Sequence, residues 1–236
     1  MKIGIFAYNF KHQKVQEGLL NLFLHSYKPE CILAANKVEL NFYQSKIRVE
    51  PKGLKYMHPK KIAEKLNIPY YIVVHNSKKC EDLIKKYNLD LGIILGARIL
   101  KGYIISAFNI GIINLHPGLI PQNRGLDNIK WAILKSLEQG VTTHLINEKI
   151  DHGKIILKKT IDIYKDDTFL DLYLRIHNME QQLMIESLKI FEAGKRNFVS
   201  VTRRGNYFKA VPPEKEKLLF QKFKEYRQQM TEDISK

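Results

Sequence analysis

The most informative stretch of this sequence is Gly111-Ile112-Ile113-Asn114-Leu115-His116-Pro117-Gly118. Its apolar first part predicts a strand that is buried on both faces, as in the middle of a parallel sheet. Pro117 and Gly118 end that strand and force a loop. Asn114 and His116 therefore lie at the carboxyl end of a central strand, which is where doubly wound sheets bind their ligands.

Strand-like and helix-like patterns alternate on both sides of this stretch, which is typical of an α/β protein. We expect an α/β fold with a Rossmann-like, mostly parallel sheet flanked by helices. The expected strands are residues 2–7, 31–35, 70–74, 91–95, 111–115, 141–147 and 154–163. The expected helices are residues 14–25, 59–66, 81–87 and 131–137, and a long helix that Thr168 caps and Gly194 ends.

The pattern changes after residue 195. Phe198–Thr202 and Tyr207–Val211 flank the turn-like Arg203-Arg204-Gly205-Asn206, which predicts a β-hairpin, and a proline pair then opens an amphipathic helix. We expect one main domain over residues 1–195 and a small C-terminal β-hairpin plus helix extension over residues 196–236. Because a two-stranded hairpin is marginal alone, we expect this extension to support a dimer.

The composition narrows the classes of partner. Lys plus Arg exceeds Asp plus Glu by 39 − 24 = 15, but these residues are spread along the chain. That distribution favours a small anionic substrate over a nucleic-acid surface. No apolar run could span a bilayer, the first residues show no signal-peptide pattern, and Cys31 and Cys80 have no metal or redox spacing. We expect a cytoplasmic protein with no metal, no membrane contact and no nucleic-acid partner.

A second polar group follows 35 positions later, in Ile150-Asp151-His152-Gly153. If this turn returns to the crevice, the Asp151 carboxylate meets the His116 imidazole. An amide, an imidazole and a carboxylate together can stabilise an oxyanion, move a proton and hold a tautomer. Each residue alone is more often a turn, cap or structural residue, so the surrounding sequence has to decide.

Three blocks of that surrounding sequence, residues 90–100, 114–125 and 140–156, together resemble the folate-dependent formyltransferase family. The resemblance implies N10-formyltetrahydrofolate as the donor co-substrate and a primary amine as the acceptor. It also implies that Asn114, His116 and Asp151 form the catalytic set. By the same analogy, the residues that contact folate, largely through the backbone, are Ala97, Arg98, Ile99, Leu100, Ile146, Asn147 and Asp151.

Departures from subfamilies narrow the acceptor. Glycinamide ribonucleotide formyltransferases carry a glycine-rich phosphate loop after the first strand, which Phe6–His12 lacks. Methionyl-tRNA formyltransferases add a larger C-terminal domain, and their loop differs from Arg124–Asn128. The loop Pro121–Gly125 and the tail Gly205–Phe208 instead resemble N-formyltransferases of nucleotide-linked amino sugars. That resemblance implies a homodimer and a dTDP- or UDP-linked amino sugar, such as dTDP-4-amino-4,6-dideoxyglucose or a dTDP-3-amino-3,6-dideoxy sugar.

Such products usually enter surface polysaccharides such as the O-antigen. The candidate substrate-binding residues are Asn9, Lys11, Asn123, Arg124, Arg203 and Tyr207. The alternatives left open are a methionyl-tRNA or glycinamide ribonucleotide formyltransferase, a hydrolase of the same folate, and a non-catalytic folate- or RNA-binding protein. Fold alone allows all of them.

Overall fold

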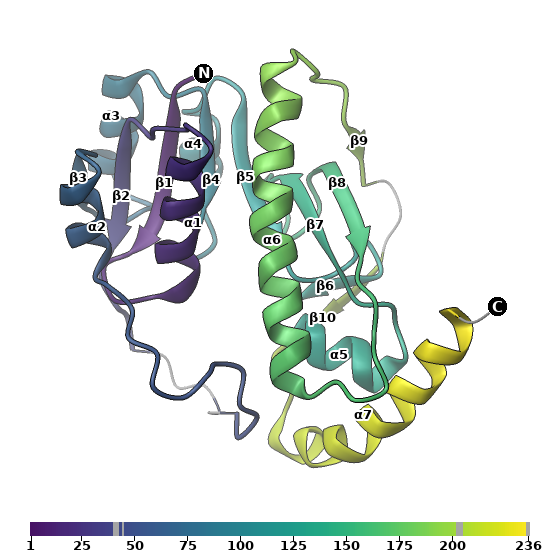
Figure 1. Ribbon diagram of the computed structural model, residues 1–236. Helices are drawn as coiled ribbons and strands as arrows, with labels where there is room; N and C mark the ends of the chain where they lie inside the picture. The colour runs from purple at the N-terminus through teal and green to yellow at the C-terminus, as the bar shows by residue number, and fades with distance from the viewer. Residues whose placement is uncertain (40–42, 44, 202–204, 235–236) are drawn as a thin grey trace.

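The protein is described by a computed structural model that places residues 1–39, 43, 45–201 and 205–234, and side chains as far as residue 231 (Figure 1). Its strands are β1 (Ile3–Tyr8), β2 (Cys31–Ala35), β3 (Tyr70–Ile72), β4 (Leu91–Ile94), β5 (Gly111–His116), β6 (Asn123–Gly125), β7 (Gly140–Leu145), β8 (Lys154–Thr160), β9 (Val199–Ser200) and β10 (Asn206–Phe208). Its helices are α1 (Gln13–Leu24), α2 (Pro59–Lys65), α3 (Lys78–Tyr87), α4 (Gly102–Ile105), α5 (Asn128–Lys135), α6 (Phe169–Glu192) and α7 (Pro213–Ile234).

The main sheet has the strand order β3-β2-β1-β4-β5-β7-β8-β9. The pairs from β3 through β5 are parallel, and the pairs from β5 through β9 are antiparallel. The order reverses at β1, so the carboxyl ends of β1, β4 and β5 meet at one edge beside a topological switch point. This arrangement confirms the predicted mostly parallel α/β sheet.

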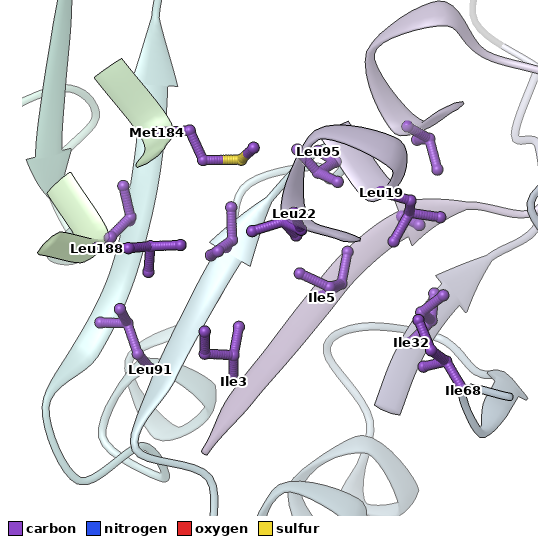
Figure 2. Close-up of a cluster of buried hydrophobic side chains, with 14 of the residues drawn as sticks. Ile3, Ile5, Leu19, Leu22, Ile32, Ile68, Leu91, Leu95, Met184 and Leu188 are labelled. Atoms are coloured by element: carbon purple, nitrogen blue, oxygen red, sulfur yellow. The ribbon is translucent and has the colours of Figure 1, made fainter. Parts of the chain in front are cut away.

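Helices cover both faces of the parallel half. Ile3 and Ile5 of β1 point to one face, where they join buried side chains of α1 and α6 (Figure 2). Phe6 points to the other face and joins buried residues of α3 and of the α4 region, such as Ile84 and Ile104. The alternation follows from the two-residue period of a strand, and burial on both faces explains the continuous apolar run.

The long helix α6 has the ends that the sequence predicts. The Thr168 hydroxyl accepts a hydrogen bond from the Asp171 backbone, and the Asp171 carboxylate accepts one from the Thr168 backbone, which is a capping box. The helix stops at Ala193, and Gly194 follows with φ +75°, a conformation that favours glycine. Figure 1 shows α6 running along the sheet from the parallel half to α5.

The predicted C-terminal β-hairpin is wrong. β9 pairs antiparallel with β8, whereas β10 pairs parallel with β6 in a separate two-stranded sheet. Each strand therefore finds its partner in the preceding 195 residues rather than in the other. The loop after β5 supplies the edge strand β6, and nothing in the local pattern of the tail reveals that partner.

The last helix is joined to this arrangement by a hydrophobic cluster. Trp131 of α5, Leu172 of α6 and Leu219, Phe223 and Tyr226 of α7 are all buried in it. The Trp131 ring also stacks on Phe208 of β10, with centroids 4.8 Å apart. α7 begins at Pro213 as the sequence predicts. In the part of the chain that the structure describes, no helix combines the length and apolarity that crossing a bilayer requires.

Candidate active site

A cavity of about 930 Å³ opens where β1, β4 and β5 end. Three parts of the fold form its wall: the strand ends, the loops at residues 97–100 and 146–151, and residues from β6, α5, α6 and β10. The lining residues used below are Tyr8, Asn76, Ala97, Arg98, Ile99, Leu100, Asn114, His116, Gly125, Leu126, Asp127, Asn128, Ile129, Ile146, Asn147, Glu148, Lys149, Ile150, Asp151, Tyr173 and Tyr207.

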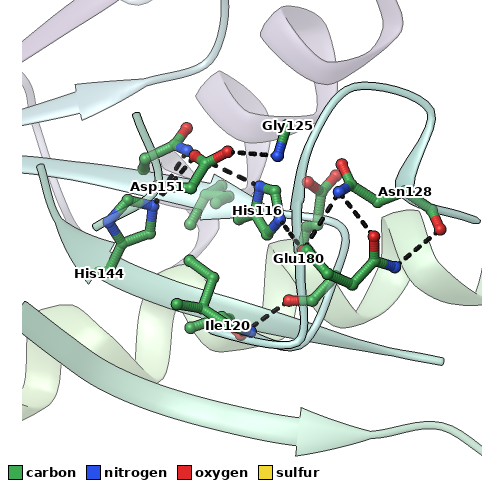
Figure 3. A network of polar contacts seen from close by, with 12 residues as sticks. His116, Ile120, Gly125, Asn128, His144, Asp151 and Glu180 are labelled. Carbon is green, nitrogen blue, oxygen red and sulfur yellow. Dashed lines mark hydrogen bonds and ion pairs between the residues drawn. The ribbon is translucent and has the colours of Figure 1, made fainter. Parts of the chain in front are cut away.

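The structure brings the predicted catalytic set together in this cavity. The turn that carries Asp151 returns to the end of β5, and its Oδ1 atom lies 3.5 Å from Nδ1 of His116 (Figure 3). The other carboxylate oxygen accepts the backbone N–H of Gly125 at 2.9 Å. His116 is buried, with 3% of its surface exposed. Burial makes these polar contacts stronger than they would be in water.

The contacts of His116 define where its proton moves. Nε2 lies 2.8 Å from the carbonyl oxygen of Asn123, and a carbonyl only accepts, so Nε2 carries a hydrogen. The proton that His116 gains or loses therefore belongs to Nδ1, the nitrogen that faces Asp151. The imidazole and the carboxylate form a pair that can take a proton from one reacting atom and return it to another.

His144 is a site residue that the sequence analysis did not select. It comes from β7 opposite Asn114 of β5, with Nε2 3.2 Å from the Asn114 amide nitrogen and 3.8 Å from Asp151 Oδ1. Complete burial, and next the neighbouring His116, lower the pKa of His144 to about 4, although Asp151 acts in the opposite direction. The ring is therefore neutral near pH 7, and Nε2 can accept one amide hydrogen of Asn114. The second amide hydrogen stays available to a substrate oxygen.

A buried ion pair supports the strand end from behind. Lys14 Nζ donates to the Leu115 carbonyl at 3.0 Å and pairs with Glu180 Oε1 at 2.8 Å. Burial alone would raise the pKa of Glu180, but Lys14 and the nearby His177 outweigh burial and lower it. The charged pair thus fixes the backbone between Asn114 and His116.

Two loops, one after β4 and one between β7 and β8, form another part of the wall. The first loop contains the candidate folate contacts Ala97, Arg98, Ile99 and Leu100. Two side chains that were not predicted hold it in place. Tyr8 donates its hydroxyl to the Ala97 carbonyl at 3.0 Å. Asn76 donates to the Ile99 carbonyl and accepts the Lys101 backbone N–H, each at 2.8 Å.

The second loop carries Ile146, Asn147 and Asp151, which the sequence analysis places beside folate. Asn147 uses its side chain inside the loop: it donates to the His152 carbonyl and accepts the Lys149 backbone N–H, each at 2.9 Å. Gly153 closes the loop against β7, because a Cβ atom there would lie 1.6 Å from the Leu145 carbonyl oxygen. The hydrogen bonds of Asn147 and the close approach at Gly153 thus fix the shape of this loop.

Of the predicted substrate-binding residues that the structure describes, Tyr207 lines the cavity and Asn9, Lys11, Asn123 and Arg124 do not. Asn9 is bonded to Asn36 and Tyr70, and Lys11 is exposed. The Asn123 amide donates to the Asn128 carbonyl, and Arg124 donates to the Gly205 carbonyl. Asn9, Asn123 and Arg124 therefore hold loops in place. Arg203 lies outside the described residues.

Metal-ligating side chains do not gather in the described ranges: no group of three or more His, Cys, Asp or Glu there could hold a metal ion. Both cysteines are buried and free. The groups that gather at the end of β5 are the Asn114 amide, the imidazoles of His116 and His144, and the Asp151 carboxylate.

A doubly wound sheet that brings an amide, an imidazole and a carboxylate together at the carboxyl ends of its strands is an arrangement suited to acyl-type transfer. The model of the formyl transferase family matches residues 45–188, more than half of the chain, and the chain belongs to this family.

Two curated relatives are methionyl-tRNA formyltransferases. The protein of Agathobacter rectalis is 30% identical over 148 residues, which are 62% of this chain and 44% of that protein. The protein of Flavobacterium johnsoniae is 34% identical over 124 residues, which are 52% of this chain and 39% of that protein. The matched part thus spans less than half of each relative.

Solved structures share the fold. Phosphoribosylglycinamide formyltransferase from Anaplasma phagocytophilum superposes with a TM-score of 0.64 at 19% identity, covering 89% of this chain and 97% of that one. An N-formyltransferase from Helicobacter canadensis, solved with folinic acid and dTDP-3-aminofucose, has a TM-score of 0.62 at 19% identity, covering 89% of this chain and 71% of that one. At these identities the likeness shows the fold alone.

Proposed function

We propose that this protein transfers the formyl group of N10-formyltetrahydrofolate to the primary amine of a nucleotide-linked amino sugar. The observation that carries the proposal is the convergence of Asn114, His116 and Asp151, from two separate segments, in one cavity of a formyl transferase family member. A protein that only binds folate has no need of an oxyanion donor beside a proton-transferring pair.

The proposed mechanism assigns a defined role to each of these groups. The neutral amine attacks the formyl carbon, and the negative charge that gathers on the formyl oxygen is stabilised by the free amide hydrogen of Asn114. The new carbon–nitrogen bond forms, and the His116–Asp151 pair accepts the proton that the amine loses. As the bond between the formyl carbon and N10 breaks, the pair returns that proton to N10, and tetrahydrofolate leaves.

The loops at residues 97–100 and 146–151 support the part of the proposal that concerns folate. Residues 97–100 and 146–150 line the cavity and include the apolar Ala97, Ile99, Leu100, Ile146 and Ile150, which suit a flat heterocycle. Arg98 and Lys149 add positive charge for an anionic co-substrate. We propose that the residues selected from the sequence in these loops contact folate.

Three observations support a nucleotide-linked amino sugar as acceptor. The loop Pro121–Gly125 and the tail Gly205–Phe208 resemble amino-sugar N-formyltransferases, and the Helicobacter canadensis structure contains dTDP-3-aminofucose. Tyr207 of that tail lines the cavity, where its ring can stack on a base or sugar. We also propose a cytoplasmic location and a role in surface polysaccharide (O-antigen) synthesis.

The division at residue 195 and the dimer stay predictions. We propose that the segment from 196 onward closes the site and contributes to a homodimer. Leu218 and Phe220 of α7 support the dimer, since they are 52% and 63% exposed. Such apolar side chains are commonly covered in a partner contact.

Methionyl-tRNA is the second candidate acceptor, because curated methionyl-tRNA formyltransferases are 30–34% identical to this chain. The deciding experiment measures tetrahydrofolate release with dTDP- and UDP-linked 3-amino and 4-amino sugars, charged initiator tRNA and glycinamide ribonucleotide. Turnover with one amino sugar supports the proposal. Turnover with charged tRNA alone, lost steeply as salt rises, contradicts it. Release without any acceptor identifies a hydrolase, and silence throughout favours a non-catalytic binder.

A further inference from the structure

A second half of the cavity is lined by residues outside the loops at residues 97–100 and 146–151. We call it the acceptor lobe and define it by Gly125, Leu126, Asp127, Ile129, Tyr173 and Tyr207. These residues come from β6, the start of α5, the first part of α6, and β10. The sequence analysis selected only Tyr207 among them.

Tyr173 brings an uncommitted hydroxyl to this lobe. Its side chain lines the cavity, and its hydroxyl makes no hydrogen bond with any residue that the structure describes. Burial, and next the nearby carboxylates of Asp127 and Glu216, raise the pKa of Tyr173. The phenol therefore stays protonated at neutral pH and can both donate and accept a hydrogen bond.

Asp127 brings a carboxylate oxygen that is only partly used. Oδ2 accepts the backbone N–H of Val211 at 2.8 Å, which fixes the side chain. Oδ1 lies 3.7 Å from Lys130 Nζ, and the ammonium of Lys130 is closer to Glu216, at 3.2 Å. The Asp127 side chain is 30% exposed, so Oδ1 is open to a donor in the cavity.

The charge of the acceptor lobe restricts what it can hold. None of the six residues that define it is Lys or Arg, and Lys130 behind the wall is buried and paired with Glu216. Among the described residues that define this lobe, a phosphate would meet the Asp127 carboxylate and no cation, which is unfavourable. An ammonium or hydroxyl group would meet an acceptor, and Leu126 and Ile129 offer apolar surface to a ring face.

We infer that Asp127 and Tyr173 recognise the amino-sugar ring of the acceptor. Asp127 accepts a hydrogen bond from one ring hydroxyl, and Tyr173 bonds to a second ring hydroxyl. The diphosphate then lies outside the acceptor lobe. This inference rests on the proposed function, and it assigns the choice of sugar to two side chains that bind without taking part in bond making.

The kinetic test uses Tyr173→Phe and Asp127→Asn in the full chain. In the second variant the amide oxygen of the new side chain still accepts the Val211 N–H, so the loop is preserved while the charge is lost. We expect KM for the amino sugar to rise about tenfold in each variant, while kcat and KM for N10-formyltetrahydrofolate change less than about twofold. Tyr226→Phe, which removes a buried hydroxyl bonded to the Leu137 carbonyl, is the matched control and should leave both KM values unchanged.

A binding measurement separates this inference from the proposed function. Calorimetric titration compares each dTDP- or UDP-linked amino sugar with its parent nucleotide, dTDP or UDP. We expect one sugar to bind at least about tenfold more tightly than its parent, and both variants to lose that gain. Such a gain without turnover overturns the proposed function and leaves the inference standing. If no sugar binds more tightly than its parent nucleotide, or if both variants keep the gain, the inference is overturned.

Discussion

The two halves of the cavity are built in different ways. The folate half consists of two loops that we propose bind folate through their backbone, and hydrogen bonds from the side chains of Asn76 and Asn147 hold these loops. The acceptor lobe consists of side chains from β6, α5, α6 and β10, with hydroxyl and carboxylate groups facing the cavity. Backbone recognition tolerates many sequences, whereas side-chain recognition changes with single substitutions. This division suits a family whose members share one formyl donor and differ in their acceptors.

The largest effect is expected where the two halves meet. Asn114→Ala, His116→Ala and Asp151→Ala should each lower kcat by about a hundredfold or more, because loss of one oxyanion donor costs about 2.7–4 kcal/mol of barrier and loss of a positioned acid–base group costs about 10²–10⁴ in rate. Thermal unfolding of each variant would show that the fold persists. Near-normal kcat in one variant would remove that residue from its proposed role.

The second largest effect is expected at His144, whose ring contacts the Asn114 amide. Because folding lowers the His144 pKa to about 4, the unfolded chain binds more protons than the folded one below about pH 6.5. The contribution of His144 to stability is therefore complete above that pH and is lost as pH falls toward 4. We expect the free energy of unfolding to fall by a few kcal/mol over this window, and to fall less in His144→Gln.

Denaturant unfolding from pH 7 to pH 4 measures this. Thr143→Val is the matched control, because it removes a buried hydrogen bond of the same strand, to Ser187, and leaves no titrating group changed. His144→Gln should also lower kcat, since Asn114 loses its partner, whereas Thr143→Val should not. Equal pH dependence in wild type and His144→Gln would exclude this role.

A smaller effect tests the folate half. Asn76→Ala removes both hydrogen bonds that hold the Ile99 and Lys101 backbone. We expect KM for N10-formyltetrahydrofolate to rise about tenfold, with KM for the amino sugar unchanged, since each lost bond is worth about 1 kcal/mol. Tyr173→Phe should give the opposite pattern. If Asn76→Ala raised both KM values equally, the two halves would not be independent.

The smallest effect is expected at Ile99, whose side chain is 65% exposed at the rim of the folate half. If recognition there depends on backbone, Ile99→Ala should change KM for N10-formyltetrahydrofolate by less than about twofold, as exposed substitutions usually do. Initial-rate kinetics at a saturating acceptor concentration measure it. A tenfold rise would show that the folate half also depends on side-chain identity.

The sequence predicted what local periodicity and strand ends control. The apolar run of β5 and the polar residues at its end placed Asn114 and His116 correctly in the fold, and Thr168 and Gly194 marked the ends of α6. Partners distant in the chain were not predictable in this way. His144 meets Asn114 only through the antiparallel register of β5 and β7.

The tail shows the same limit. The pattern of residues 198–211 contained two strands but no information on what they pair with, and β6 is three residues long inside a loop. Tyr173 looked like any other position of a long helix. Its role depends on where α6 crosses the cavity, which is a property of the packed structure.

The parallel pairing of β10 with β6 also sets an order of assembly during synthesis. Every residue that lines the folate half precedes residue 152, whereas the acceptor lobe needs Tyr173 and Tyr207. Until the tail has been added, β6 has no strand beside it and the cavity lacks Tyr207. Docking of β10 is thus the step that completes the acceptor lobe.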